Sequence, residues 1–212
     1  MTRKVFWEDP YLRELDTRVA SVDGDGVIVE ATIFFAFSGG QESDTGFLAG
    51  LPVLEARKQG RDIVYILPAE HGLSRGDRVR MQIDWERRYR LMRLHFAAEL
   101  VLEVAYRLLP GVEKIGAHIS AEKARLDFHW AENISASFAG ILTEVRSLID
   151  ADHRILSAYE DEAGERRYWE IPGFARVPCG GTHLKSTGEV GMIDLRRRNV
   201  GRSKERIDIL LL

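Results

Sequence analysis

Cys179 and His183 are the two residues whose types and spacing point most directly to chemistry. They enclose Gly180, Gly181 and Thr182 in the run CGGTH, and Cys179 is the only cysteine of the chain. The glycine pair lets the backbone bend until both side chains point the same way, and thiolate and imidazole are both zinc ligands. The alternative is a glycine turn with a buried cysteine and an exposed histidine. The lone cysteine excludes an internal disulfide.

His95 and Glu99 form a second candidate pair. They are four residues apart in a stretch typical of a helix, so their side chains lie on one face about one turn apart. A lone helical histidine is more often a hydrogen-bonded core residue, and such pairs are common on surfaces. Together with Cys179 and His183, however, the pair completes a four-ligand set that zinc accepts. The sequence therefore favours a zinc site.

The elements that must position these residues change character near residue 85. Before it, the β-branched and aromatic residues of 17–35 predict a hairpin around the turn DGDG, and 62–69 and 77–84 predict two further strands. These patterns predict a small β-barrel domain over residues 1–84.

The second part opens with a long helix. Asp84 is a suitable N-cap, 85–109 contains no Gly or Pro, and Pro110 and Gly111 end the run. We expect a second helix over 134–150 and strands near 115–120, 124–129, 154–160, 166–171, 189–197 and 205–211. The fold class predicted for the chain is α+β, with the helices of an 85–212 domain packed on an antiparallel sheet.

A glycine-rich run, SGGQESDTG, covers residues 38–46. It lacks the P-loop lysine and the dinucleotide-binding spacing, so no nucleotide cofactor is predicted. We expect Gly39, Gly40 and Gly46 to let backbone approach a neighbouring active site, and Gln41 and Asp44 to hold the shape of the loop.

Charge and composition narrow the classes of partner. The 212 residues are 45% hydrophobic and carry a net charge of −3, so a nucleic acid would have to be held by local basic clusters. Two such clusters exist, although runs of charge are usually solvated faces: Arg87, Arg88, Arg90 and Arg93, and then Arg196, Arg197, Arg198, Arg202, Lys204 and Arg206. No stretch approaches the ~18 apolar residues of a membrane span, and the N-terminal run turns acidic early. We expect no membrane partner and a cytoplasmic location.

The combined motifs resemble a known family. LMRLHFAAEL and VPCGGTHL correspond to a helical H-x-x-x-H and a later C-x-x-x-H, and ATIFFAFSGGQESDTG, GAHISAEKARLDF, STGEVGMIDL and GRSKERIDIL provide further matches over nearly the whole chain. These are hallmarks of the free-standing alanyl-tRNA editing proteins (AlaX type, medium-length form), which are related to the editing domain of alanyl-tRNA synthetase.

The resemblance implies a zinc-dependent hydrolase that deacylates mischarged seryl-tRNA, or glycyl-tRNA, of the alanine tRNA. Zinc is then expected to orient the substrate, which makes Cys179 a ligand and a Cys-His nucleophilic dyad the lesser alternative. Thr32 matches the family threonine and would recognise the serine hydroxyl; the plainer interpretation is a threonine that suits a strand. Gly116 and His118 would lie near the substrate, with a packed or exposed His118 as the alternative.

The same resemblance assigns partners to the charged residues. The arginine clusters, with Arg87, Arg88, Arg196 and Arg202 as candidates, would hold the phosphates of the tRNA acceptor end. Arg125 and Asp127 are expected to form a structural pair.

Glu99 departs from the family pattern, which has histidine there. If Glu99 ligates, thiolate and carboxylate neutralise the charge of Zn²⁺, and the site polarises its surroundings less strongly. If it does not, three protein ligands leave an open position and Glu99 could act as general base toward a water. The departure keeps two other functions open: a non-catalytic tRNA-binding module stabilised by zinc, and a zinc-dependent hydrolase of another small ester or amide.

Overall fold

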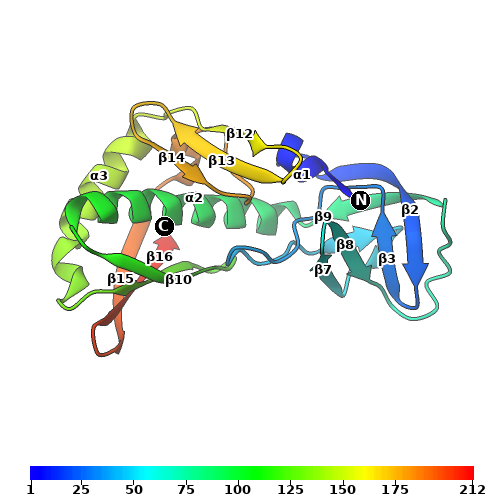
Figure 1. Cartoon of the computed structure of the whole chain (residues 1–212), viewed down its shortest axis with the longest axis horizontal. Helices are drawn as coiled ribbons and strands as arrows, with labels where there is room; N and C mark the ends of the chain where they lie inside the picture. The colour runs from blue at the N-terminus through cyan, green and yellow to red at the C-terminus, as the bar shows by residue number, and fades with distance from the viewer. The chain divides into compact units, whose positions relative to one another are not determined.

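The chain forms two structural units in the computed structural model, which describes residues 1–212. The first unit comprises 1–38 and 42–89, and the second comprises 39–41 and 90–212. Both units contain antiparallel sheet and helix, so the predicted α+β class is confirmed (Figure 1). No helix has the length and apolar character needed to cross a membrane.

The first unit is built on a curled antiparallel sheet with the strand order β6-β5-β9-β2-β3-β8-β7. Strand β2 pairs with β9 up to Arg18 and with β3 from Val19, and its register shifts between Val19 and Ser21. Such an irregularity bends a strand and increases its twist, which curls the sheet into an open half-barrel. The strands are β2 (Glu14–Asp23), β3 (Gly26–Val29), β5 (Gly46–Leu48), β6 (Leu51–Pro52), β7 (Glu55–Gln59), β8 (Asp62–Ile66) and β9 (Arg78–Ile83).

The predicted strands of this unit are present, and the structure adds elements that the sequence patterns do not indicate. These are β5, β6 and β7 and, near the N-terminus, β1 (Arg3–Lys4) and α1 (Val5–Glu8). The second strand expected within 17–35 is divided into β3 and β4 (Ala31–Thr32), and β4 pairs with β1. The concave side is filled by side chains such as Val27, Phe34, Tyr65 and Met81, all of them fully buried.

Helix α2 (Trp85–Leu108) is the long helix predicted from the sequence. The backbone N–H of Arg87 donates to Asp84 Oδ1 at 3.1 Å, which confirms Asp84 as the cap of the first turn. From Leu91 to Ala105 most side chains are buried on every side of the helix. A helix that is apolar all round belongs in a core, and this part of α2 is the centre of the second unit.

The second unit covers α2 with two antiparallel sheets. One has the order β10-β11-β16-β15 and comprises β10 (Glu113–Ile119), β11 (Ala124–His129), β15 (Ile193–Gly201) and β16 (Lys204–Leu211); the other comprises β12 (Leu156–Asp161), β13 (Arg166–Ile171) and β14 (Ala175–Pro178). Helix α3 (Phe138–Asp150) follows a 3-10 turn, η1 (Ile134–Ser137), and a second turn, η2 (Thr187–Val190), precedes β15.

Two details of this unit differ from the prediction. The expected strand over 189–197 is divided between η2 and β15, because Ser186 and Glu189 form a capping box that starts a turn of helix there. Strand β14 is absent from the prediction; it is four residues long and contains a proline at its end, which weakens the strand pattern.

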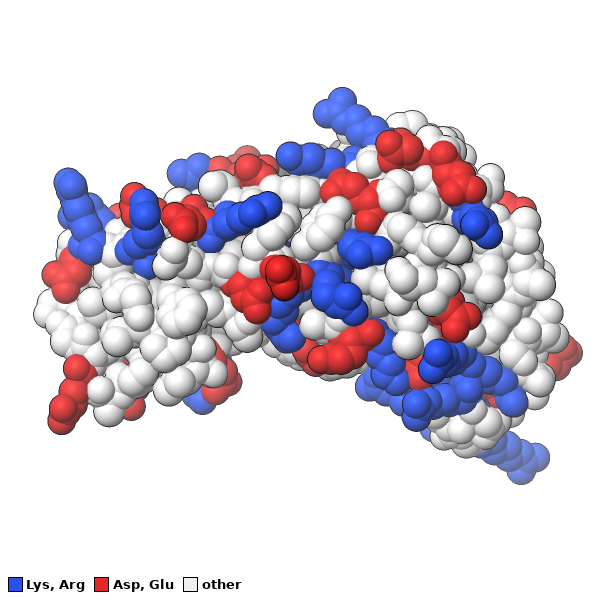
Figure 2. Space-filling model, turned by 180° about the vertical axis from the view of Figure 1, so that it is seen from behind, with Lys and Arg blue, Asp and Glu red and all other residues white.

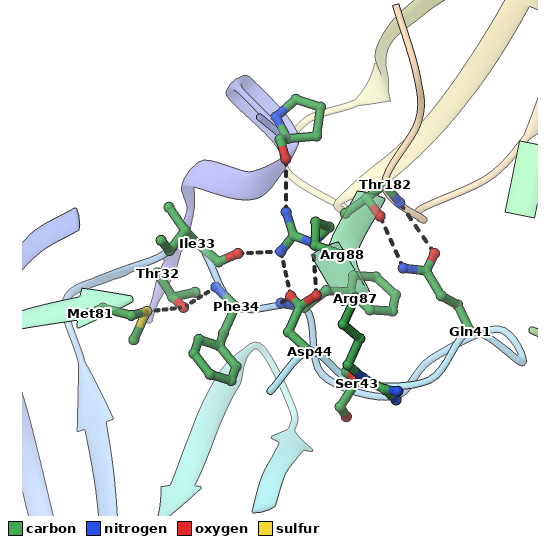
Figure 3. A network of polar contacts seen from close by, with 12 residues as sticks. Thr32, Ile33, Phe34, Gln41, Ser43, Asp44, Met81, Arg87, Arg88 and Thr182 are labelled. Carbon is green, nitrogen blue, oxygen red and sulfur yellow. Dashed lines mark hydrogen bonds and ion pairs between the residues drawn. The ribbon is translucent and has the colours of Figure 1, made fainter. Parts of the chain in front are cut away.

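A buried ion pair ties the glycine-rich loop of the first unit to the start of α2. Arg88 and Asp44 are both fully buried in their side chains. The guanidinium donates to Asp44 through Nε (2.8 Å) and Nη2, and to the carbonyl oxygens of Pro10 (2.9 Å) and Ile33 (2.5 Å) (Figure 3). Asp44 also accepts from the backbone N–H of Phe35 at 2.6 Å. Asp44 therefore holds the loop, as expected from the sequence.

This arrangement predicts a large stability difference between two aspartate substitutions. Asp44→Ala would leave the Arg88 charge buried without its partner, which costs about 3–5 kcal/mol. Asp16→Ala is the matched control, because the Asp16–Arg80 pair is exposed on both sides and such pairs contribute little. Urea unfolding followed by circular dichroism measures both variants. Equally small shifts of the two midpoints would contradict the structural role given to Arg88 and Asp44.

Candidate metal centre

Three metal-ligating side chains converge in the second unit. His95 Nε2 lies 3.4 Å from Cys179 Sγ, and Cys179 Sγ lies 3.3 Å from His183 Nε2. The three donor atoms all lie within 4.8 Å of one another. Metal bonds of about 2.0–2.1 Å to nitrogen and 2.3 Å to sulfur in a tetrahedron place such donors roughly 3.5 Å apart. The cluster could therefore hold a metal ion with little adjustment.

The local fold explains how these residues meet. His95 is carried by the buried part of α2, whereas Cys179 and His183 follow β14, and the Cys179 N–H donates to the Arg167 carbonyl of β13 at 2.9 Å. A Cβ at Gly181 would lie 1.9 Å from His95 Cε1. Only glycine permits this approach, which gives the second glycine of the CGGTH run its physical reason.

Both histidines are oriented by polar partners that contact their Nδ1 atoms. His95 Nδ1 donates to Gln41 Oε1 at 2.6 Å, and His183 Nδ1 lies 3.0 Å from Ser157 Oγ. Gln41 is itself fixed, because its amide nitrogen donates to Thr182 Oγ1 at 2.9 Å (Figure 3). Partners of this kind set the tautomer and leave Nε2 to face the metal. The geometry makes Gln41, Ser157 and Thr182 supporting residues of the cluster.

Gln41 reaches this position because the segment 39–41 pairs with strand β10. The Ile119 N–H donates to the Gly40 carbonyl at 2.8 Å, and Gln41 forms a parallel bridge with Ile119. Gly40 has a φ of +87°, and a Cβ there would lie 2.6 Å from the Ala117 carbonyl oxygen. The glycine thus allows the close backbone approach that places the Gln41 side chain beside His95.

Glu99 lies at the cluster without being part of its compact donor set. Its Oε1 is 3.1 Å from His95 Nε2, the same nitrogen that faces Cys179. The compact set itself contains only His95, Cys179 and His183. A cation bound at Nε2 would displace the hydrogen shared with Glu99, and the carboxylate would then need another partner.

The electrostatics follow from burial and from these contacts. Burial alone lowers the pKa of His95, but the neighbouring Cys179 and Glu99 outweigh it and raise the pKa to about 10. For Glu99, burial is outweighed by the hydrogen bond to His95 and its charge, and the pKa falls to about 2. Burial and the His95 charge lower the pKa of His183 to about 3. These shifts favour a protonated His95, a neutral His183 and an ionised Glu99 at neutral pH.

The predicted substrate-binding residues and the predicted Arg125–Asp127 pair lie outside the metal-ligating cluster. Gly116 and His118 are on β10, where a Cβ at Gly116 would lie 3.2 Å from Asp127 Oδ2. The expected pair of Arg125 and Asp127 is confirmed, with the Nη1–Oδ2 distance at 3.2 Å. Thr32 is fully buried in the first unit, where its hydroxyl contacts Tyr65 OH (2.5 Å) and accepts from the Phe34 N–H (2.9 Å).

The remaining glycines and arginines of the predicted site differ in backbone conformation, exposure and ion pairing. Gly39 and Gly46 both have positive φ, and a Cβ at Gly46 would lie 2.1 Å from the Gln82 carbonyl oxygen. Arg196 and Arg202 are exposed, and Arg87 is paired with Glu42 at 2.7 Å. Arg88 is the exception. Its burial against Asp44 leaves no face for a phosphate, and its expected contact with tRNA is incompatible with that position.

Two supporting residues are absent from the sequence-based prediction. Thr182 lies inside the CGGTH run, so the motif itself carries the signal. Ser157 lies 26 residues before His183 on strand β12, and nothing in its sequence surroundings marks it as a partner of the cluster.

The protonated His95 predicts that metal affinity rises with pH. Each proton displaced by zinc should strengthen binding about tenfold per pH unit below the pKa of the displaced group. Competition titrations against a chromophoric chelator between pH 6 and 9 measure this change of zinc affinity.

Gln41→Ala should weaken zinc binding about 10–100-fold, because Gln41 orients His95. His129 is an exposed histidine on β11, and His129→Ala should leave zinc binding unchanged. Affinity that does not vary with pH, or equal losses in the two variants, would contradict the assignment.

The chain is similar to a known domain family and to individual proteins over its full length. Residues 169–208, which include Cys179 and His183, match the family described as threonyl and alanyl tRNA synthetase second additional domain. The chain is 34% identical to the alanyl-tRNA editing protein AlaX-M of Pyrococcus horikoshii over 100% of its own length and 98% of that protein. It is 32% identical to AlaX-M of Saccharolobus solfataricus, with 98% of each chain covered.

The likeness extends to a larger enzyme. The chain is 35% identical to the alanine–tRNA ligase of Ignicoccus hospitalis over 92% of its own length, although this covers only 24% of the ligase. The matches to the AlaX-M proteins cover the whole chain and not a single motif. The chain therefore belongs to the AlaX-M family of alanyl-tRNA editing proteins.

Proposed function

We propose that the chain is a trans-editing hydrolase that removes serine, with glycine as a second candidate, from mischarged alanine tRNA at a zinc site. The observation that carries the proposal is the convergence of His95, Cys179 and His183 in a full-length relative of AlaX-M editing proteins. Two imidazoles and one thiolate form a donor set that suits zinc. A cytoplasmic location, where tRNA is charged, agrees with this function.

The reaction needs positioning more than a covalent nucleophile. Water attacks the carbonyl carbon of the ester and the bond to the terminal ribose oxygen breaks. The ribose oxygen takes one proton of the water, the other is released to solvent, and the amino acid leaves as its carboxylate. Such an ester is already activated, so orienting the reactants and stabilising the oxyanion account for most of the catalysis required. A bound zinc ion would supply a positive centre that orients the amino group or the carbonyl oxygen.

Cys179 acts as a ligand rather than a nucleophile in this proposal. Its sulfur faces the Nε2 atoms of two histidines at 3.4 and 3.3 Å, whereas a nucleophilic dyad needs one histidine as base. Gln41 and Ser157 hold the two rings, which keeps the geometry ready before the substrate arrives.

Glu99 is proposed as the fourth ligand. Its contact with His95 Nε2 at 3.1 Å depends on a hydrogen that metal binding removes. An ionised, largely buried carboxylate cannot remain without a partner, so it either joins the metal or accepts a hydrogen bond from the attacking water. Ligation is favoured because Glu99 occupies the helical spacing of the family histidine, and it makes the site formally neutral.

Recognition of the serine hydroxyl and of tRNA completes the proposal. A pocket that excludes alanine must pair the hydroxyl of serine with a polar group that alanine would leave unsatisfied. Thr32 is the candidate from the family resemblance, with His118 and Gly116 as further substrate contacts. The burial of Thr32 favours a structural role in the first unit. Arg87, Arg196 and Arg202 are proposed contacts for tRNA phosphates.

Deacylation of seryl-tRNA and alanyl-tRNA, both on the alanine tRNA, tests the proposed function. We expect zinc-loaded protein to remove serine and spare alanine, and both chelator-treated protein and Cys179→Ala to reduce the rate toward background. His129→Ala is the matched control and should retain full activity. Thr32→Val should lower the ratio of seryl to alanyl rates if Thr32 recognises serine. No turnover by folded, zinc-loaded protein would favour a binding module or another ester substrate.

Two Glu99 variants separate the roles proposed for this carboxylate. If Glu99 ligates, Glu99→His should keep zinc and activity, and Glu99→Gln should lose zinc affinity. If Glu99 is the base, both variants should keep zinc and lose activity. Zinc titration and the deacylation rate, measured on the same preparations, distinguish these outcomes.

A further inference from the structure

The outer face of the β10-β11-β16-β15 sheet carries rows of charged side chains. The opposite face is mainly apolar: Leu126, Phe128, Ile207 and Ile209 are buried there, beside the ion pair of Arg197 and Glu205. Ion pairs place the charges on the outer face: Asp127 binds Arg125 and Arg206, and Asp208 binds Lys123 and Arg198. Arg196 opposes Asp208 in the register of β15 and β16. Because side chains two residues apart share a face, Asp194 and Lys204 belong to it as well.

Two carboxylates of this face are more buried than the arginines of β15. The side chain of Asp208 is 3% exposed and that of Asp127 is 15% exposed, whereas those of Arg196 and Arg198 are 69% and 64% exposed. Asp127 and Asp208 thus lie deeper than the arginines of β15, and Asp208 pairs with Arg198. Asp194 is 40% exposed beside Arg196, so solvent, and any partner, meets these arginines together with one carboxylate.

The face is positive although the chain is negative. The outer face has six cations and four carboxylates: Lys123, Arg125, Arg196, Arg198, Lys204 and Arg206 against Glu113, Asp127, Asp194 and Asp208. Cations therefore outnumber carboxylates by two on this face, whereas the whole chain carries a net charge of −3. Figure 2 shows Lys and Arg gathered on the part of the molecule that ends in the β15–β16 hairpin (Figure 2).

The chemistry of these groups suits phosphate. Four of the six cations are arginines, whose planar guanidinium groups form bidentate hydrogen bonds to phosphate. The exposed apolar residues Met192 and Val200 flank the β15 row at its two ends and do not interrupt its charges, whereas a membrane-inserting surface needs a continuous apolar face. Exposed arginines in rows on one face of a sheet fit the regular phosphate array of an RNA helix.

Strand β10 connects this face to the metal centre. Its residue His118 pairs in register with Arg125 on the cationic rows, and the next residue, Ile119, forms the bridge with Gln41. Gln41 in turn contacts His95. The edge of the sheet nearest the glycine-rich segment is thus the edge nearest the cluster.

We propose that this sheet face, organised by the buried Asp208 and the partly buried Asp127, is the surface on which the tRNA backbone docks. The proposal rests on the proposed function for the identity of the RNA. It goes beyond that function by assigning the docking surface to the outer face of one sheet and by giving two carboxylates the task of ordering its cations.

Binding of uncharged alanine tRNA, measured by fluorescence anisotropy over a series of salt concentrations, tests this surface without requiring turnover. Arg196→Gln combined with Arg198→Gln should weaken binding at least about tenfold at low salt and reduce the salt slope by about two. Arg146→Gln combined with Arg166→Gln makes the same charge change at exposed positions outside the face, and it should change affinity less than twofold.

The outcomes separate this proposal from the proposed function. Loss of tRNA binding in the sheet-face variant, with its circular dichroism spectrum and zinc affinity unchanged, supports the docking surface. Equal losses in both variants, or none in either, would overturn it. Loss of binding to anionic phosphatidylserine vesicles with tRNA binding intact would also overturn it and would indicate a membrane surface. A wild-type protein that binds tRNA through this face without deacylating it would contradict only the proposed function.

Discussion

The hydrogen bond from His95 Nδ1 to Gln41 Oε1, at 2.6 Å, is the contact on which the candidate metal centre depends. His95 is buried, and a buried imidazole needs a partner for each nitrogen. Because Gln41 occupies Nδ1, Nε2 is left to face Cys179. The bond requires the Gly40 backbone to lie against β10, and it leaves space beside His95 that only a glycine at 181 fits. The glycine-rich segment and the CGGTH loop are therefore parts of one constraint.

The sequence predicts those parts whose signals are local. Helix α2 is recognisable because its stretch lacks Gly and Pro and starts at a capping Asp84, and the pairing of Cys179 with His183 is visible in their four-residue spacing. The meeting of His95 with Cys179, which are 84 residues apart, rests on the family resemblance. The role of Gln41 toward His95 is not predictable in this way, because it depends on the pairing of a short segment with a distant strand.

Two arginines show why the function of a charged residue cannot be predicted from a basic run in the sequence. Arg88 and Arg196 both stand in basic runs, and the sequence predicts tRNA contact for both. Arg88 is buried against Asp44, where it supports the first unit, whereas Arg196 is 69% exposed beside the partly exposed Asp194. The difference arises from which carboxylate each one meets in the fold. The sequence pattern alone cannot separate a buried pair from an exposed cation.

Zinc K-edge X-ray absorption spectroscopy of the zinc-loaded, full-length chain tests the central claim most directly. The account predicts one sulfur at about 2.3 Å and three nitrogen or oxygen neighbours at about 2.0–2.1 Å, with the multiple-scattering signature of two imidazoles. Because Cys179 is the only cysteine, a sulfur shell identifies it as the ligand. A first shell of nitrogen and oxygen alone would contradict the proposal that His95, Cys179 and His183 hold the metal together.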